Sequence, residues 1–131
     1  MSVKFIVTGG AGFIGSNLTL ALNEKGCDDI LIVDMLDCDG KKKNLENLKF
    51  RDYLNKDDFR KQFISGKLNI VDTVFHLGAC SSTTETNTEY LIDNNFQYTK
   101  DICKWCLAHN VRFIYASSAA TYGNWSTGIF R

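Results

Sequence analysis

The sequence predicts an α/β protein with a doubly wound parallel sheet of about five strands and helices on both faces. Two observations predict this class. Short apolar segments alternate five times with amphipathic segments along the chain, and the apolar segments are continuous runs rather than alternating ones. Continuous runs are typical of strands that are buried on both faces, as in a parallel sheet. Right-handed crossovers between such strands then give the strand order 3-2-1-4-5.

The first half of the chain predicts two strands around one helix. Residues 4–10 (KFIVTGG) are a short apolar run that ends in glycine and predict the first strand. Residues 13–26 have apolar side chains at helical spacing, and Gly26 fits the position that follows a helix end. Residues 29–34 (DILIVD) predict a second buried strand.

The second half repeats the alternation with longer connections. A polar segment comes first and predicts a loop, and the later helices have aromatic and aliphatic residues at helical spacing. The predicted elements are a loop over residues 35–47, a short strand over 48–54, a helix over 56–65, a strand over 71–79, a long helix over 88–109 and a strand over 111–118.

The composition is that of a single soluble domain. The chain has 131 residues, of which 44% are hydrophobic and 23% charged, so we expect one domain over residues 1–123 and a tail over 124–131 without an assigned element. Fifteen basic and fifteen acidic side chains cancel, which favours neither nucleic acid nor a membrane surface as a partner. No segment approaches the roughly 20 apolar residues of a membrane span.

The cysteines favour a reducing compartment. Five cysteines at irregular spacing fit free thiols in the cytoplasm better than a disulfide framework. Cys103 and Cys106 have the spacing of a redox motif, but they fall inside a predicted helix, so we interpret them as packing residues. Cys80 is also interpreted as a packing residue, and His76 as a satisfied core histidine rather than a base. No cluster of side chains has the spacing of a metal site.

A glycine-rich segment between the first strand and the first helix points to a ligand. Gly9, Gly12 and Gly15 stand at G-x-x-G-x-x-G spacing in TGGAGFIGS. Such glycines allow a tight turn, let a pyrophosphate approach the backbone and let the helix pack on the sheet. Asp34 ends the second strand nineteen residues after Gly15, where an acidic side chain can bind a ribose hydroxyl. We therefore predict a Rossmann-type dinucleotide site; a strand–turn–helix without a ligand is the alternative.

The choice between NADP and NAD is open at this level. Asp34 by itself favours NAD, because a carboxylate repels a 2′-phosphate. Lys41, Lys42 and Lys43, and then Lys56, follow it in the chain and could neutralise that phosphate. The alternative interpretation of the lysine run is a solvated loop.

Three motifs taken together carry a family resemblance. TGGAGFIGSN, FHLGACSSTTE and YASSAATYG resemble the N-terminal part of the extended short-chain dehydrogenases/reductases, which include nucleotide-sugar epimerases. GACSSTTE followed by DNNFQYTK is similar, more narrowly, to the ADP-L-glycero-D-manno-heptose 6-epimerases of Gram-negative bacteria. The resemblance covers residues 3–123, which is under half of a full-length family member. Full-length members are homo-oligomers.

The resemblance implies roles for individual residues. Asp34 and Met35 would meet the adenosine ribose, although family members usually have Asp-Asn there, so Met35 is a departure. Ser118 matches the serine that hydrogen-bonds a substrate hydroxyl. The implied cofactor-binding residues are Gly9, Gly12, Phe13, Ile14 and Gly15 at the pyrophosphate, Asp34, Met35, Lys41 and Lys56 at the ribose and 2′-phosphate, Leu77, Gly78, Ala79, Cys80 and Ser81 at the nicotinamide ribose, and Asn94 as a support of that loop; the implied substrate-binding residues are Ser81, Ser82 and Ser118.

The reaction that the resemblance implies is NADP-dependent epimerisation of ADP-heptose at C6″ through a transient ketone. Its base is the tyrosine of a Tyr-x-x-x-Lys motif, but none of the five tyrosines here has a lysine four positions later, and the sequence ends 13 residues after Ser118. We therefore expect a truncated chain that is inactive alone. A stand-alone NAD(P)-binding module and a non-functional truncated product are the alternatives.

Overall fold

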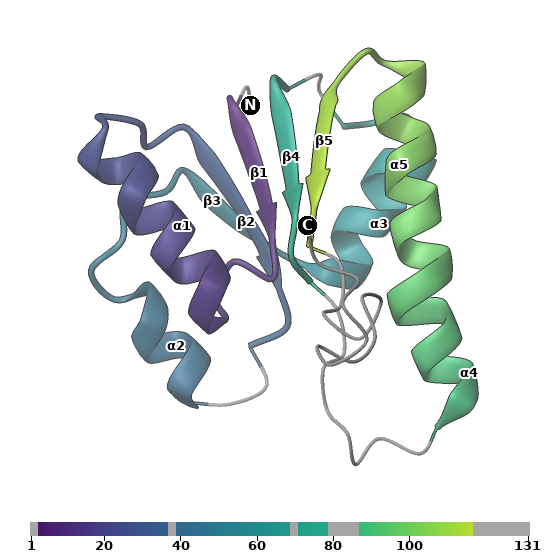
Figure 1. The fold of residues 1–131 in the computed structure, drawn as a ribbon, viewed down its shortest axis with the longest axis horizontal. Helices are drawn as coiled ribbons and strands as arrows, with labels where there is room; N and C mark the ends of the chain where they lie inside the picture. The colour runs from purple at the N-terminus through teal and green to yellow at the C-terminus, as the bar shows by residue number, and fades with distance from the viewer. Residues whose placement is uncertain (1–2, 37–38, 69–70, 79–86, 117–131) are drawn as a thin grey trace, which may run out of the picture.

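The computed structural model describes residues 3–36, 39–68, 71–78 and 87–116, and its centre is a five-stranded parallel sheet (Figure 1). The strand order β3-β2-β1-β4-β5 confirms the prediction. Each predicted strand is present, although the regular strands are shorter than the apolar runs. The strands are β1 (Phe5–Thr8), β2 (Ile30–Asp34), β3 (Asp52–Asn55), β4 (Thr73–His76) and β5 (Arg112–Tyr115).

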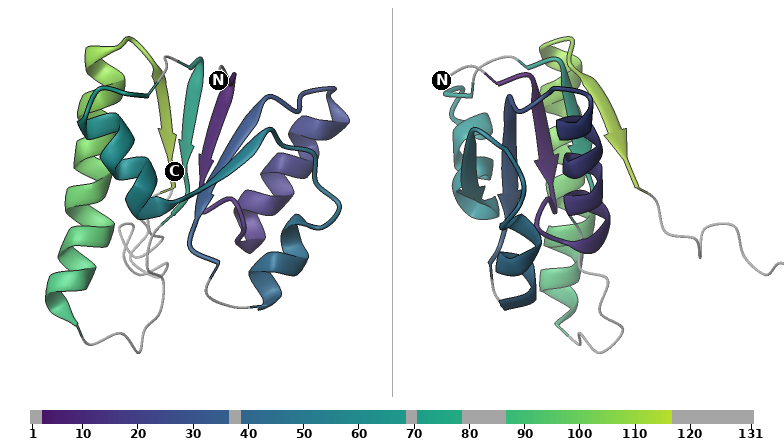
Figure 2. Two further views of the ribbon diagram at one scale, coloured as in Figure 1. Left: turned by 180° about the vertical axis from the view of Figure 1, so that it is seen from behind. Right: turned by 90° about the vertical axis from the view of Figure 1, so that its left-hand side faces the viewer.

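Helices cover both faces of the sheet (Figure 2). The helices α1 and α2 pack on one face of the sheet, and α3 and α5 pack on the opposite face. The helical segments are α1 (Phe13–Glu24), α2 (Asp39–Leu45), α3 (Lys56–Ile64), α4 (Thr88–Leu91), the π-helix η1 (Ile92–Gln97) and α5 (Tyr98–Ala108).

The alternation of strand side chains divides the core into two layers. On one face, Ile6, Leu31 and Val74 pack under aromatic and aliphatic residues of α3 and α5, including Phe59 and Ile102. The opposite layer is smaller and contains three fully or almost fully buried strand residues, Val7, Ile30 and Ile32. All five residues of β2 are buried, as a central strand with helices on both sides requires.

The segment predicted as a loop over residues 35–47 contains the helix α2, so that prediction is wrong. This helix has no buried residue, which is why its apolar pattern is weak. Asp39 lies in its first turn and two lysines in its last turn, and these charges complement the helix dipole. Leu45 packs against the smaller core layer.

The long helix predicted over residues 88–109 is interrupted by the π-helix η1. The Thr99 hydroxyl donates to the carbonyl of Asn95 at 3.1 Å, a side-chain bond that competes with the backbone ladder of a helix. Arg60 of α3 contacts Asp93 in η1 and Asp101 in α5. The π-helix η1 therefore lies where side chains of α3, η1 and α5 meet. Short π-helical turns within α-helices often occur at functional sites.

Candidate functional site

The carboxyl ends of β1, β2 and β4 lie next to one another at the point where the chain changes direction across the sheet. From β1 the chain runs outward through β2 and β3, and it then crosses to β4 on the other side of β1. Such a switch point is where open α/β sheets bind ligands. The loops that follow these three strands begin with Gly9, Met35 and Leu77.

Two of the loop glycines are required by the protein's own packing. Gly9 has φ +68°, and a Cβ there would lie 2.7 Å from the backbone nitrogen of Gly78. A Cβ on Gly15 would lie 2.2 Å from the carbonyl oxygen of Gly9. Both distances are shorter than any real contact, so the first glycine allows the turn and the third brings α1 against it.

Gly12 is less closely surrounded by the described residues than Gly9 and Gly15 are. Its φ is −78°, so the backbone conformation at this position does not require glycine. A Cβ on Gly12 would have one neighbour among the described residues within 4 Å, the carbonyl oxygen of Gly9 at 3.3 Å. That single contact is tight, but no other described atom crowds this position at the start of α1, which fits the approach of a pyrophosphate.

The N-terminus of α1 can hold an anion. Gly12 is its N-cap and makes no side-chain capping bond, and the first backbone N–H groups of a helix have no partner within the helix. Phe13 is 80% and Ile14 65% exposed, so the first turn faces outward with little side-chain cover. Those N–H groups and the helix dipole favour a phosphate at this position.

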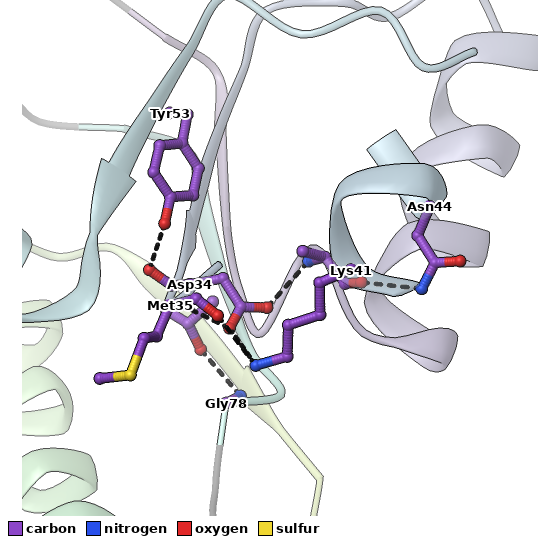
Figure 3. A network of polar contacts seen from close by, with 8 residues as sticks. Asp34, Met35, Lys41, Asn44, Tyr53 and Gly78 are labelled. Carbon is purple, nitrogen blue, oxygen red and sulfur yellow. Dashed lines mark hydrogen bonds and ion pairs between the residues drawn. The ribbon is translucent and has the colours of Figure 1, made fainter. Parts of the chain in front are cut away.

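Asp34 ties the end of β2 to the glycine loop, as Figure 3 shows for its carboxylate. The residue is 8% exposed, and its Oδ2 accepts a hydrogen bond from Ala11 N at 2.9 Å. Oδ1 accepts from Met35 N at 2.7 Å and from Lys41 Nζ at 3.0 Å. The carboxylate is thus fixed in position and partly neutralised before any ligand arrives.

Lys41 and Asn44 reach this carboxylate and the glycine loop from α2 (Figure 3). The Lys41 ammonium also donates to the carbonyl of Met35 at 3.0 Å, and the Asn44 side chain donates to the carbonyl of Ala11 at 2.9 Å. Tyr53 of β3 donates its hydroxyl to the carbonyl of Asp34 at 2.7 Å. Sequence reasoning missed Asn44 and Tyr53, because neither belongs to a motif and α2 was not expected.

Lys56 lies at the same edge of the sheet but contacts different partners. It follows Asn55, which pairs with Asp34 in the register of β2 and β3. Its carbonyl accepts the hydroxyl of Tyr98 at 2.7 Å, and its charge is one of the causes that lower the pKa of Asp93, after the hydrogen bond from Arg60. Lys41 is therefore the lysine that contacts Asp34, while the contacts of Lys56 run toward Tyr98 and Asp93.

His76 ends β4 and links three segments. Its Nδ1 lies 2.6 Å from the hydroxyl of Thr8 and its Nε2 lies 2.8 Å from the hydroxyl of Thr99. Burial lowers the pKa of His76 from 6.5 to about 4, so the ring is neutral at pH 7. The interpretation of His76 as a satisfied core histidine is confirmed. The backbone N–H groups of Leu77 and Gly78 donate to the same Thr8 hydroxyl, each at 3.1 Å.

Several expected site residues fall outside the described part of the chain. Ala79, Cys80, Ser81, Ser82 and Ser118 lie in such segments, as does the tail over 124–131, so their roles stay predictions. The backbone of Asn94 lies in η1, and its side chain is outside the description.

Among the described residues, Cys106 is a buried free thiol. Burial raises the pKa of Cys106 to about 12, with the nearby Cys103 as a smaller cause. This inert thiol agrees with a packing role. Across residues 3–36, 39–68, 71–78 and 87–116, no group of three metal-ligating side chains is present. Within the same ranges, no helix has the length and apolar character needed to cross a membrane.

The chain is similar to a known protein family and to several solved structures. The model of the NAD dependent epimerase/dehydratase family matches residues 5–129. ADP-L-glycero-D-manno-heptose-6-epimerase of Helicobacter pylori is 31% identical with a TM-score of 0.77 over 94% of this chain and 41% of that one. UDP-glucose 4-epimerase of Thermotoga maritima is 28% identical with a TM-score of 0.75, over 92% of this chain and 40% of the other. UDP-glucuronic acid 4-epimerase of Bacillus cereus, solved with NAD, is 26% identical with a TM-score of 0.75, over 93% and 42%.

This chain matches only part of the length of each of these three proteins. The chain spans about 40% of each of the three solved structures. The shared part is the sheet with its glycine loop, and the fold is the Rossmann-type fold of these enzymes.

Proposed function

Because the chain belongs to the NAD dependent epimerase/dehydratase family, we propose that it is the NADP-binding part of a nucleotide-sugar epimerase that acts on ADP-heptose. One observation carries the cofactor part of this proposal. Gly9 and Gly15 are needed by the packing of the loop, whereas a Cβ on Gly12 would meet one described atom, the carbonyl oxygen of Gly9 at 3.3 Å, at a helix N-terminus without a side-chain cap. That arrangement gives a pyrophosphate both room and hydrogen-bond donors.

The described residues would hold the cofactor in three places. The first turn of α1 would bind the pyrophosphate, Asp34 would face the adenosine ribose, and Gly78 would lie beneath the nicotinamide ribose. The cofactor, when bound, would supply the acceptor and donor of the hydride that epimerisation needs. The protein's own contribution here is binding and orientation, and Ser118 is proposed to orient the substrate hydroxyl.

The preference for NADP over NAD rests on Lys41. Its ammonium lies 3.0 Å from Asp34 Oδ1, so a cation stands beside the carboxylate that would otherwise repel a 2′-phosphate. Lys41 is 28% exposed at its side chain, which leaves part of it accessible to a ligand. Lys56 is proposed as a second phosphate contact from the same sheet edge.

ADP-heptose is the proposed substrate for two reasons. The GACSSTTE and DNNFQYTK motifs resemble those of the heptose epimerases, and the Helicobacter pylori enzyme is 31% identical over 94% of this chain. A UDP-sugar is the second candidate, favoured by the matches to UDP-glucose and UDP-glucuronic acid 4-epimerases. We further propose that the protein works in the cytoplasm in lipopolysaccharide precursor synthesis, and that the whole protein is a homo-oligomer.

Calorimetric titration of the 131-residue chain with NADP⁺ and NAD⁺ tests the cofactor proposal. We expect binding of both, with NADP⁺ about tenfold tighter. Absence of binding to either nucleotide contradicts the proposed function, and equal affinities contradict the role of Lys41. Titration of the NADP⁺-loaded chain with ADP-heptose and with UDP-glucose then compares the two substrate classes, and tighter binding of UDP-glucose would favour the second candidate.

A further inference from the structure

We propose that the hydrogen-bonded series Thr8–His76–Thr99, in which Thr8 and His76 are buried, positions the floor of the dinucleotide site. This inference rests on the proposed function, because it assigns a role in cofactor binding to residues that do not themselves touch the ligand. Thr8 and His76 end the two central strands β1 and β4, and Thr99 is the second residue of α5. These hydrogen bonds therefore connect β1 and β4, the strands that flank the switch point, to the helix α5.

The direction of each hydrogen bond follows from the donors and acceptors present. A threonine hydroxyl has one O–H to donate and two lone pairs to accept with. Thr8 Oγ1 is approached by the N–H groups of Leu77 and Gly78, each at 3.1 Å, and an N–H can only donate. The lone pairs of Thr8 Oγ1 are thus engaged, and its own proton is directed to His76 Nδ1 at 2.6 Å.

This assignment fixes the tautomer of His76. A ring nitrogen that accepts the Thr8 proton carries no hydrogen, so the hydrogen of the neutral ring is on Nε2. Nε2 then donates to Thr99 Oγ1 at 2.8 Å, and Thr99 donates its own proton to the carbonyl of Asn95 at 3.1 Å. Every bond in the chain has one donor and one acceptor, and the last acceptor is the π-helix η1.

The first link of the chain acts directly on the site. Leu77 N also donates to the carbonyl of Thr8 at 3.1 Å, so the bond from Gly78 N is the one that depends on the Thr8 hydroxyl. A Cβ on Gly78 would lie 3.1 Å from Gly9 N and 3.2 Å from Thr8 Oγ1. The backbone of Gly78 therefore lies against the first glycine of the loop, and the Thr8 hydroxyl accepts its N–H.

The surroundings of His76 keep its ring neutral and oriented. The ring stacks on Tyr98 at 6.0 Å with a 9° interplanar angle and on Phe113 at 6.0 Å with 24°. A protonated ring would place a hydrogen on Nδ1, opposite the proton that Thr8 donates, because both Thr8 lone pairs face backbone N–H groups. The arrangement thus admits one tautomer and one ring orientation, which is what a positioning residue needs.

Isosteric variants separate this role from simple packing. Thr8→Val keeps the shape but removes the hydroxyl, whereas Thr8→Ser keeps the hydroxyl. Thr19→Val is the matched control, because Thr19 is also fully buried and donates to the carbonyl of Gly15 at 3.0 Å. We expect the Kd of the chain for NADP⁺ to rise at least about tenfold in Thr8→Val and to change less than about twofold in Thr8→Ser and Thr19→Val.

The outcomes distinguish this inference from the proposed function. A folded Thr8→Val variant that binds NADP⁺ like the wild type overturns the positioning role while leaving the proposed function in place. Wild-type protein that binds no dinucleotide overturns both. If Thr8→Val does not fold, Thr99→Val breaks the chain at its other end and should weaken binding in the same direction.

Nitrogen-15 NMR of the wild-type imidazole at pH 7 provides a readout that does not depend on binding. We expect His76 with a protonated Nε2 and an unprotonated Nδ1. A protonated Nδ1 would overturn the hydrogen-bond directions and with them the proposal.

Discussion

The ammonium nitrogen of Lys41 lies 3.0 Å from Oδ1 of Asp34, and the same carboxylate accepts the backbone N–H of Ala11 through its other oxygen. The pair joins α2, the end of β2 and the glycine loop in one cluster. A charged group that would repel a phosphate is therefore accompanied by one that would attract it.

Replacing Lys41 with methionine should reduce the preference for NADP⁺. Removing one cation from a partly exposed phosphate contact costs about 1 kcal/mol, so the Kd for NADP⁺ should rise roughly five- to tenfold, while the Kd for NAD⁺ should change little. Lys43→Met is the matched control, because Lys43 is exposed on the same helix. Calorimetric titration of both variants with both nucleotides measures this, and an equal loss for NADP⁺ and NAD⁺ in Lys41→Met would contradict the assignment.

A side chain at Gly12 should abolish cofactor binding without unfolding the sheet. The backbone of Gly12 has φ −78°, which any residue adopts. A Cβ there meets one described atom, the carbonyl oxygen of Gly9 at 3.3 Å, and Gly12→Val would occupy the position proposed for the pyrophosphate. Circular dichroism should match the wild type while NADP⁺ binding falls below detection. In contrast, Gly15→Ala places a Cβ 2.2 Å from the carbonyl oxygen of Gly9 and should lower the melting temperature. Retained binding in a folded Gly12→Val variant would show that the loop does not hold the pyrophosphate.

The stability of the chain should fall between pH 6.5 and about pH 4 because of His76. Burial lowers the pKa of His76 from 6.5 to about 4, so in this window the unfolded chain binds a proton that the folded chain does not. Acid therefore favours unfolding, and below about pH 4 both states carry the proton and the contribution is lost. The difference amounts to roughly 3 kcal/mol.

Urea unfolding at a series of pH values measures this dependence. The slope across the window should decrease in His76→Gln and persist in His109→Gln, since His109 is exposed. If His76→Gln does not fold, NMR titration of the wild-type ring gives its pKa directly. A folded-state pKa near 6.5 would refute the prediction.

Removing the Arg60 guanidinium should loosen the contact between α3 and the η1–α5 segment. Arg60 bonds both carboxylate oxygens of Asp93, at 3.0 and 2.9 Å, and Asp101 at 3.0 Å, and its hydrogen bond is the main cause that lowers the pKa of Asp93. We expect Arg60→Met to lower the free energy of unfolding by about 1 kcal/mol. Lys61→Met is the control, because Lys61 is exposed on the same helix. An unchanged denaturation midpoint in 50 mM salt or less, where screening is weak, would show that this network contributes nothing.

The sheet could be predicted from the sequence because its strands are buried on both faces. Runs such as Ile30–Asp34 have no polar interior position, and the order of strands and helices then fixes the parallel topology. The glycine positions and Asp34 were also correctly placed at the switch point. Each of these features is encoded in a short contiguous segment.

The missed features depend on contacts between distant segments. The helix α2 has no buried residue, and its side chains Lys41 and Asn44 bond to Asp34 and Ala11, which lie up to 33 residues away in the sequence. The π-helix η1 is likewise tied to Arg60, at least 33 residues earlier in the chain. Local periodicity contains no information about such partners, so α2, η1 and the contacts of Asn44 and Tyr53 could not be predicted.

The close passage of Gly9 and Gly78 has a consequence for how this sequence can vary. A Cβ at either position would meet backbone atoms of the other, at 2.7 Å from Gly78 N or 3.1 Å from Gly9 N. Because the obstacle is main chain, shortening a neighbouring side chain cannot relieve it. Second-site suppressors of a Gly9 substitution should therefore be missing at position 78, and every missense codon reached from a glycine codon at position 9 adds at least one carbon. In a saturation library selected for cofactor binding, we therefore expect glycine to be the only residue recovered at position 9.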